Sequence, residues 1–204
     1  GDDEMPSVPR PAVPTAPLWN SAFEHDSCGV GLVVDIAGRP SREIVDRALG
    51  GLVNLTHRGG VGADSRTGDG AGVLSQVPLA LFQNELEAAG RFGVRQGELG
   101  VAMTFLPIAD DQARAAREAV EAAARDRGLD PVAWRVVPVE PGALGQQATA
   151  SMPRIEQLLI VRPDGMDEET FERELFLARK GCERAAAAAD WPGFFIASCS
   201  ARTL

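Results

Sequence analysis

The chain has 204 residues, of which 45% are hydrophobic and 24% are charged, the values of an ordinary soluble globular protein. Its 29 acidic residues outnumber its 20 basic residues, and the net charge of −9 argues against a nucleic acid or an anionic membrane surface as partner. Three widely spaced cysteines favour a reduced compartment over a disulfide framework, and no apolar run approaches the roughly 20 residues of a membrane span, so we expect a cytoplasmic protein.

Residues 1–27 have the composition of an extended leader. They hold five of the fourteen prolines and start with an acidic run. Proline removes backbone donors and keeps the chain extended, and the segment lacks the basic start and apolar stretch of a secretory signal. We therefore expect a leader or propeptide at 1–27 and a domain that begins at residue 28.

Between residues 29 and 98, the pattern predicts two strands and two helices around a glycine-dense stretch. The apolar, β-branched residues 29–36 predict a buried strand, and residues 73–77 predict a second strand. Ser41 can cap an amphipathic helix that reaches Leu55, and Pro78 opens another helix. Six glycines fall within residues 59–72, a density that lets the backbone approach another group closely.

From residue 99 onward, strands and helices alternate regularly. Apolar residues at helical spacing predict one helix that starts after Asp110 and ends at Gly128. A longer helix carries an apolar stripe from Phe171 through Ala185 to Ala189. Strands are predicted at residues 101–106, 132–139, 155–161 and 194–200. This β-α-β, β-α-β order fits a split βαβ subdomain over residues 99–200.

Cys28 is the first candidate for chemistry, because it lies between the leader and the first predicted strand. Cleavage after Ser27 would give it a free α-amine, with an unperturbed pKa of about 7.7–8.0, on the same residue as the thiol. That amine can act as the base, so no separate histidine is needed. On position alone, a small buried cysteine at a strand edge is the commoner alternative.

Two further motifs lie in the glycine-dense stretch. Residues 57–60, His-Arg-Gly-Gly, can place an arginine fork beside a carboxylate, although a helix end with a cation and a glycine stop has the same pattern. Residues 67–72, Thr-Gly-Asp-Gly-Ala-Gly, match neither a phosphate loop nor a dinucleotide-binding motif. A tight turn is the alternative there, and Asp69 can brace that turn so that the glycines approach a site.

A metal site is not predicted. His25 and Cys28 are three residues apart, but no second ligand pair occurs at a usual zinc spacing. Cys182 lies on the apolar helical stripe and Cys199 lies in a predicted strand, so we expect both in the core.

Taken together, the motifs resemble the start of the large chain of glutamate synthases, which are class II glutamine amidotransferases. The Cys-Gly start is shared by the whole class, whereas its combination with the acidic end of the leader and the Thr-Gly-Asp-Gly loop is more specific. The resemblance extends over residues 18–204 and rests on the segments 24–31, 54–60, 67–72, 152–157 and 195–203.

The resemblance implies a four-layer α/β/β/α N-terminal-nucleophile hydrolase fold (an α/β, or α+β, class), incomplete at the C-terminus. Cys28 would hydrolyse the side-chain amide of glutamine. Arg58 and Gly59 would orient the cysteine and its amine, and Gly60 and Asp69 would support the loop. The ammonia would reach 2-oxoglutarate and form glutamate.

The resemblance also implies partners and cofactors outside this segment. They are FMN and an iron–sulfur cluster, NADPH or ferredoxin as electron source, the remainder of the glutamate synthase chain, and a small NADPH-oxidising flavoprotein subunit. The family's Asn-Gly oxyanion pair and its Arg-Phe-Ser-Thr substrate segment would follow Leu204. Because losing one oxyanion donor costs about 10²–10³ in rate, we expect residues 1–204 alone to be inactive.

The residues also leave a second interpretation open. Residues 99–200 can be a small split-βαβ ligand-binding or regulatory module without catalysis, with residues 1–98 as an appendage. The region around Cys28 separates the two interpretations, because a regulatory module has no use for a processed cysteine.

Overall fold

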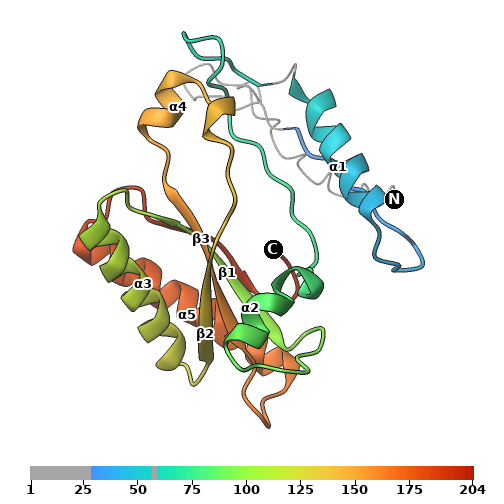
Figure 1. The fold of residues 1–204 in the computed structure, drawn as a ribbon, viewed down its shortest axis with the longest axis vertical. Coiled ribbons are helices and arrows are strands. Elements are labelled where there is room, and N and C mark those ends of the chain that lie inside the picture. Colours follow the sequence, from blue (N-terminus) through green and yellow to red (C-terminus); the bar gives the residue numbers. More distant parts are fainter. Residues whose placement is uncertain (1–28, 57–58) are drawn as a thin grey trace, which may run out of the picture.

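The computed structural model describes residues 29–56 and 59–204. In this part of the chain, four strands form one antiparallel sheet with the order β2-β3-β1-β4 (Figure 1). The strands are β1 (Leu99–Leu106), β2 (Asp130–Val136), β3 (Arg154–Val161) and β4 (Phe195–Ser200). The helices are α1 (Arg42–Asn54), α2 (Gln83–Ala88), α3 (Asp110–Arg125), α4 (Gln146–Ala150) and α5 (Glu168–Ala189), with 3₁₀ turns at Leu79–Phe82 and Pro141–Ala143.

The strand order interleaves two β-α-β units. β3 lies between β1 and β2, the two strands that α3 connects, and β1 lies between β3 and β4, the two strands that α5 connects. The central pair is continuous in register, from Leu99 opposite Val161 to Leu106 opposite Arg154. The predicted positions of these elements agree with the observed ones within a few residues. That residues 99–200 form a separate subdomain stays a prediction.

Helices α3 and α5 pack against one face of the sheet, because their apolar residues recur every three or four positions. Gly128 takes a positive φ of 72° just beyond α3, as expected of a glycine that ends a helix. The prediction for α5 is wrong at its C-terminal end, where Ala185 and Ala189 are exposed and Ala186 is buried instead. The core residues that α5 supplies are Phe171, Leu175, Ala178, Cys182 and Ala186.

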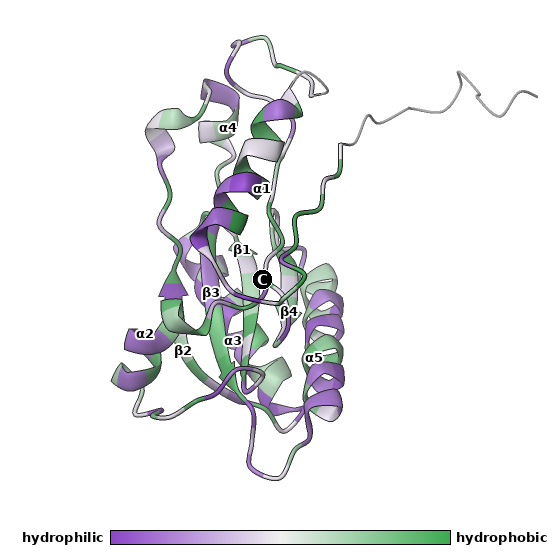
Figure 2. Ribbon diagram, turned by 90° about the vertical axis from the view of Figure 1, so that its right-hand side faces the viewer, coloured by the Kyte–Doolittle hydropathy of each residue, from purple (hydrophilic) through white to green (hydrophobic). Residues whose placement is uncertain are grey.

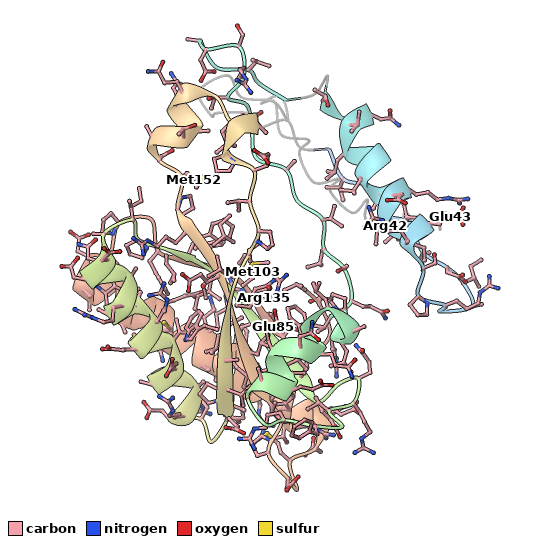
Figure 3. The ribbon with its side chains drawn as sticks, in the orientation of Figure 1. Arg42, Glu43, Glu85, Met103, Arg135 and Met152 are labelled. Carbon is pink, nitrogen blue, oxygen red and sulfur yellow. The ribbon has the colours of Figure 1, made fainter. Side chains whose placement is uncertain are left out.

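The opposite face of the sheet is only partly covered. Phe82 and Leu86, from the 3₁₀ turn and α2, pack against one end of it together with Val101 of β1. Arg135 of β2 donates to Glu85 of α2 at 3.1 Å and to Gln157 of β3 at 2.9 Å (Figure 3). Toward the other end of the sheet, the side chains on this face are more exposed. Phe195, in the edge strand β4, is 55% exposed. Among the described residues no second sheet covers this end.

The predicted strand at residues 29–36 is wrong. These residues form an extended segment outside the sheet, with Val30, Leu32 and Ile36 at 92%, 89% and 100% exposure (Figure 2). The residues have strand propensity, but a strand also needs a neighbour for its backbone N–H and C=O groups. The described part of the chain supplies none to this segment.

The second predicted strand, residues 73–77, is present only as a fragment. Ser75 and Leu204 exchange two backbone hydrogen bonds of 2.9 and 2.8 Å, and Val77 N–H donates to Arg202 at 3.1 Å. The pairing amounts to one isolated bridge, between Gln76 and Thr203.

Helix α1 begins where the sequence predicts. The Ser41 side chain accepts a hydrogen bond from the N–H of Ile44, and the helix ends at Asn54. Its apolar stripe nevertheless has no partner layer, because no residue of α1 is buried and Val53 is 72% exposed.

None of the helices within residues 29–56 and 59–204 is long and apolar enough to cross a bilayer.

Candidate functional site

The start of the predicted domain lies against the end of α1. A Cβ built on Gly29 would come within 2.8 Å of Leu55 Cδ2, so the backbone at Gly29 touches the Leu55 side chain. Gly29 follows Cys28 in the chain, and Leu55 precedes the His-Arg-Gly-Gly motif. Cys28, His57 and Arg58 themselves lie outside the described residues. The described neighbours of two predicted motifs are thus in contact, although 26 positions separate them.

The end of α1 leads into the glycine-dense loop, which we define as residues 59–72. Leu55 N–H donates to Gly51 and Leu52, at 3.1 and 3.0 Å, and closes the last turn of the helix. Gly59 N–H donates to the Thr56 carbonyl at 3.2 Å, which ties the start of the loop to the end of α1. The helix end therefore fixes where Gly59 enters the loop.

Asp69 braces the entry of the loop. Its Oδ2 accepts the Gly60 N–H at 2.7 Å, and its own N–H donates to the Gly60 carbonyl at 3.2 Å. A Cβ on Gly68 would lie 3.1 Å from that carbonyl, and an antiparallel bridge joins Val61 to Gly68. The two glycine motifs therefore lie side by side, and Asp69 holds them together. A part for Asp69 and Gly60 in catalysis stays a prediction.

A second carboxylate, which sequence reasoning missed, shapes the tip of the loop. Asp64 accepts hydrogen bonds from Thr67 N–H at 2.7 Å, from Arg66 N–H at 3.1 Å and from Thr67 Oγ1 at 2.6 Å. These donors, chiefly the Thr67 hydroxyl, hold the pKa of Asp64 well below its usual range. The signal in the sequence is the Asp-x-x-Thr spacing, since aspartate side chains favour such turns.

The loop is attached to the connection between β2 and β3. Asp64 Oδ2 accepts the Gln147 N–H at 3.3 Å, and the Arg66 guanidinium donates to the Gly142 carbonyl at 2.9 Å. Gly145 allows this approach, because a Cβ there would lie 2.3 Å from Thr67 Oγ1 and 2.6 Å from Thr67 N. About eighty residues of chain separate these partners, so no local pattern predicts the contact.

The two described cysteines are poor nucleophiles. Cys182 is buried as predicted, and Cys199 is half-buried against the same core. Burial raises the pKa of each thiol to about 12, so the reactive thiolate is scarce at neutral pH.

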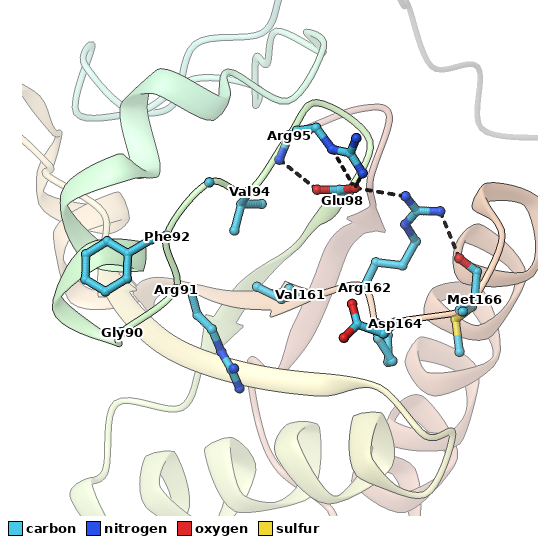
Figure 4. A pocket seen from close by; sticks show the side chains of 13 residues that line it. Gly90, Arg91, Phe92, Val94, Arg95, Glu98, Val161, Arg162, Asp164 and Met166 are labelled. Carbon is cyan, nitrogen blue, oxygen red and sulfur yellow. Dashed lines mark hydrogen bonds and ion pairs between the residues drawn. The ribbon is translucent and has the colours of Figure 1, made fainter.

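A polar hollow of about 550 Å³ lies at the other end of the sheet, between residues 90–98 and 161–166 (Figure 4). Glu98 accepts hydrogen bonds from Arg95 and Arg162, which lowers the pKa of Glu98 to about 2. Glu98 thus engages both arginines, and the hollow contains none of the predicted site residues. Among the described residues, no three His, Cys, Asp or Glu side chains gather as a metal ion would require.

Comparisons with known proteins match this chain over nearly its whole length. The glutamate synthase [NADPH] large chain of Azospirillum brasilense is 36% identical over 194 residues, which are 95% of this chain and 13% of that protein. The chloroplastic ferredoxin-dependent glutamate synthase of Oryza sativa is 35% identical over 196 residues, 96% of this chain and 12% of that protein. The glutamate synthase [NADH] of Schizosaccharomyces pombe is 37% identical over 193 residues, 92% of this chain and 9% of that protein. The chain therefore spans only a small part of the length of each relative.

The family model of the class-II glutamine amidotransferases matches residues 28–204. The match begins at the residue that follows the predicted leader, and it includes the loop and the sheet described above. The chain belongs to the class II glutamine amidotransferase family.

Proposed function

We propose that this chain is the glutaminase part of a glutamate synthase and that Cys28 is its nucleophile. The observation that carries the proposal is the convergence of three motifs: Gly29 touches Leu55 at the end of α1, and Asp69 binds Gly60 two positions beyond Arg58. The similarity to glutamate synthases and the family match from residue 28 support it.

The proposed reaction begins when cleavage after Ser27 frees the α-amine of Cys28. The amine takes the thiol proton, and the sulfur attacks the side-chain carbonyl carbon of glutamine. The protonated amine then gives its proton to the leaving nitrogen, so ammonia departs and a glutamyl thioester remains. Water, deprotonated by the same amine, attacks the thioester and releases glutamate and the thiol. One residue therefore acts as nucleophile, base and acid.

The neighbouring motifs supply orientation. Arg58 and Gly59 hold the terminal cysteine and its amine, and Asp69 keeps Gly60 in place behind them. Such positioning matters, because a misplacement of about 1 Å can cost about 10² in rate. The raised pKa of Cys182 and Cys199 leaves Cys28 as the thiol suited to nucleophilic attack.

We also propose the four-layer α/β/β/α arrangement for the complete domain. The exposed apolar segment 29–36 and the fragment 73–77 would belong to a second sheet, which would pack on the open end of the face that carries Arg135. Burial of these apolar side chains would contribute about 25 cal/mol for each Å² removed from water.

The remaining steps belong to other parts of a glutamate synthase. Ammonia would react with 2-oxoglutarate, and FMN, an iron–sulfur cluster and NADPH or ferredoxin would supply the electrons. The cysteines of residues 29–204 do not suit a cluster, because clusters bind thiolates and burial disfavours the thiolates of Cys182 and Cys199. The remainder of the chain and a flavoprotein subunit are the proposed partners, in the cytoplasm.

Covalent labelling tests the assignment of the nucleophile. A diazo-ketone analogue of glutamine is expected to alkylate Cys28 in the complete gene product, and Cys28→Ser is expected to abolish both labelling and glutamine hydrolysis. Cys199→Ser is the control and should be labelled like the parent. Label on Cys182 or Cys199 would show that the assignment is wrong.

A further inference from the structure

Two aspartates of this chain make the same local turn in different surroundings. Asp64 and Asp167 each stand three residues before a threonine and accept both its N–H and its hydroxyl. At Asp167 these distances are both 2.8 Å, and the turn caps the first residues of α5. At Asp64 they are 2.7 and 2.6 Å, and no helix follows. The Asp64 turn therefore does not cap a helix that follows it in the chain.

The Asp64 turn differs from its counterpart in its link to a distant segment. Asp64 Oδ2 also accepts the Gln147 N–H at 3.3 Å, and Thr67 Oγ1 accepts the Ala148 N–H at 3.4 Å. Both donors lie in α4, on the long connection between β2 and β3. The two side chains of the turn thus satisfy backbone groups that a five-residue helix leaves without partners.

The close approach of the two segments depends on Gly145. A Cβ at this position would lie 2.4 Å from Asp64 Oδ2 and 2.3 Å from Thr67 Oγ1. It would also lie 2.6 Å from the backbone nitrogen of Thr67, so a change of side-chain rotamer alone would not relieve the clash. Arg66 adds a hydrogen bond to Gly142 at 2.9 Å on the same side. The connection and the loop therefore fit each other only with glycine at 145.

The held turn leads directly to the motif beside the predicted nucleophile. The Thr67 carbonyl accepts the Gly62 N–H at 2.6 Å, and the next pair along the two arms of the loop is Val61 with Gly68. Beyond it, Asp69 binds Gly60, which follows Gly59. The contacts form a short ladder from α4 to Gly60.

We propose that Asp64, Thr67 and Gly145 are positioning residues, which fix the loop against the β2–β3 connection so that Gly59 and Gly60 are held at the reacting centre. The inference rests on the proposed function of this site. It assigns to the β2–β3 connection, about eighty residues away in the chain, a part in glutamine hydrolysis.

The test compares matched variants in the complete gene product. In Asp64→Asn one carboxylate oxygen becomes an NH₂ group, which cannot accept the Gln147 N–H, while the remaining oxygen can still close the turn. Asp167→Asn makes the same change where no distant segment is bound. Gly145→Ala has Gly181→Ala as its control, because a Cβ at Gly181 meets nothing within 4 Å.

We expect Asp64→Asn and Gly145→Ala to lower kcat for glutamine hydrolysis, and the rate of Cys28 alkylation by the diazo-ketone, by about 10- to 100-fold. KM should change much less. The two controls should keep the parent kcat and labelling rate. Thr67→Ser keeps the hydroxyl and should retain the parent rate, whereas Thr67→Val should lose it, a difference that a purely structural role would not produce.

The inference would be overturned, and the proposed function left intact, if kcat and the labelling rate were the same in Asp64→Asn and Gly145→Ala as in their controls. Loss of rate in Thr67→Ser as large as in Thr67→Val would also contradict it. If Cys28 of the parent protein is not labelled at all, the proposed function fails, and the inference fails with it.

Discussion

Two regions of the described chain both contain apolar, regularly patterned segments but use them differently. In residues 99–200 every strand has a neighbour, and α3 and α5 bury their apolar stripes on one face of the sheet. In residues 29–77 an equally apolar segment and an amphipathic helix have almost nothing to pack on. Composition and periodicity therefore indicate what a segment can form, and the availability of a partner decides whether it forms.

The largest expected effect contrasts two leucines. Leu175→Ala, on the buried face of α5, should lower the free energy of unfolding by about 2–5 kcal/mol, because it removes buried methyl groups and leaves a cavity. In residues 1–204 alone, Leu32→Ala, at an 89% exposed position, should change it by about 0.5 kcal/mol or less. Urea denaturation measures both. An effect of Leu32→Ala as large as that of Leu175→Ala would contradict the difference in packing between residues 29–77 and residues 99–200.

A smaller contrast compares two arginines that pair with carboxylates. Arg117 of α3 forms a two-point pair with Glu156 of β3, whose side chain is only 6% exposed. Arg117→Ala should cost about 1–3 kcal/mol, since it leaves a buried charge without its partner. Arg42 pairs with Asp46 on the exposed surface of α1, and Arg42→Ala should cost about 0–1 kcal/mol. Equal costs in urea denaturation would contradict this assignment of buried and exposed charge.

The Asp167 cap should make stability depend on pH. The Thr170 N–H and hydroxyl lower the pKa of Asp167 in the folded chain, so the folded state binds this proton less readily than the unfolded state. The carboxylate's contribution is fully present above the ordinary aspartate pKa of about 3.9 and is lost as the pH falls through the lower folded value. The melting temperature of Asp167→Asn should therefore fall below that of the parent at neutral pH and approach it in acid. A difference that does not change with pH would show that the charge plays no part.

The smallest expected effect concerns the cap of α1. Ser41→Ala removes a single 3.4 Å hydrogen bond from a helix that buries no residue. We expect the first turn of α1 to fray and its amide protons to exchange faster, with a change of about 0.5 kcal/mol or less in global stability. A cooperative loss of the sheet in Ser41→Ala would show that α1 is part of the same folding unit.

The sequence predicts residues 99–200 well, because the apolar spacing of each helix and strand is a local signal. The strands and helices that pack together also lie within this same region. The stripe of α5 is misplaced only at its C-terminal end, where Ala185 and Ala189 are exposed and Ala186 is buried, because a run of alanines offers no contrast in size. The strand at 29–36 is wrong because propensity does not reveal whether a neighbouring strand exists. The contact between Gly145 and Thr67 lies beyond any local pattern, although the Asp64 turn that makes it has a recognisable spacing.

The most direct test of the central claim is the mass of the mature chain, measured together with its activity. When the complete reading frame is expressed and the protein hydrolyses glutamine, mass spectrometry should find a chain that starts at Cys28, because only a free α-amine can serve as the base. Full glutaminase activity from a chain that still carries residues 1–27 would contradict the account.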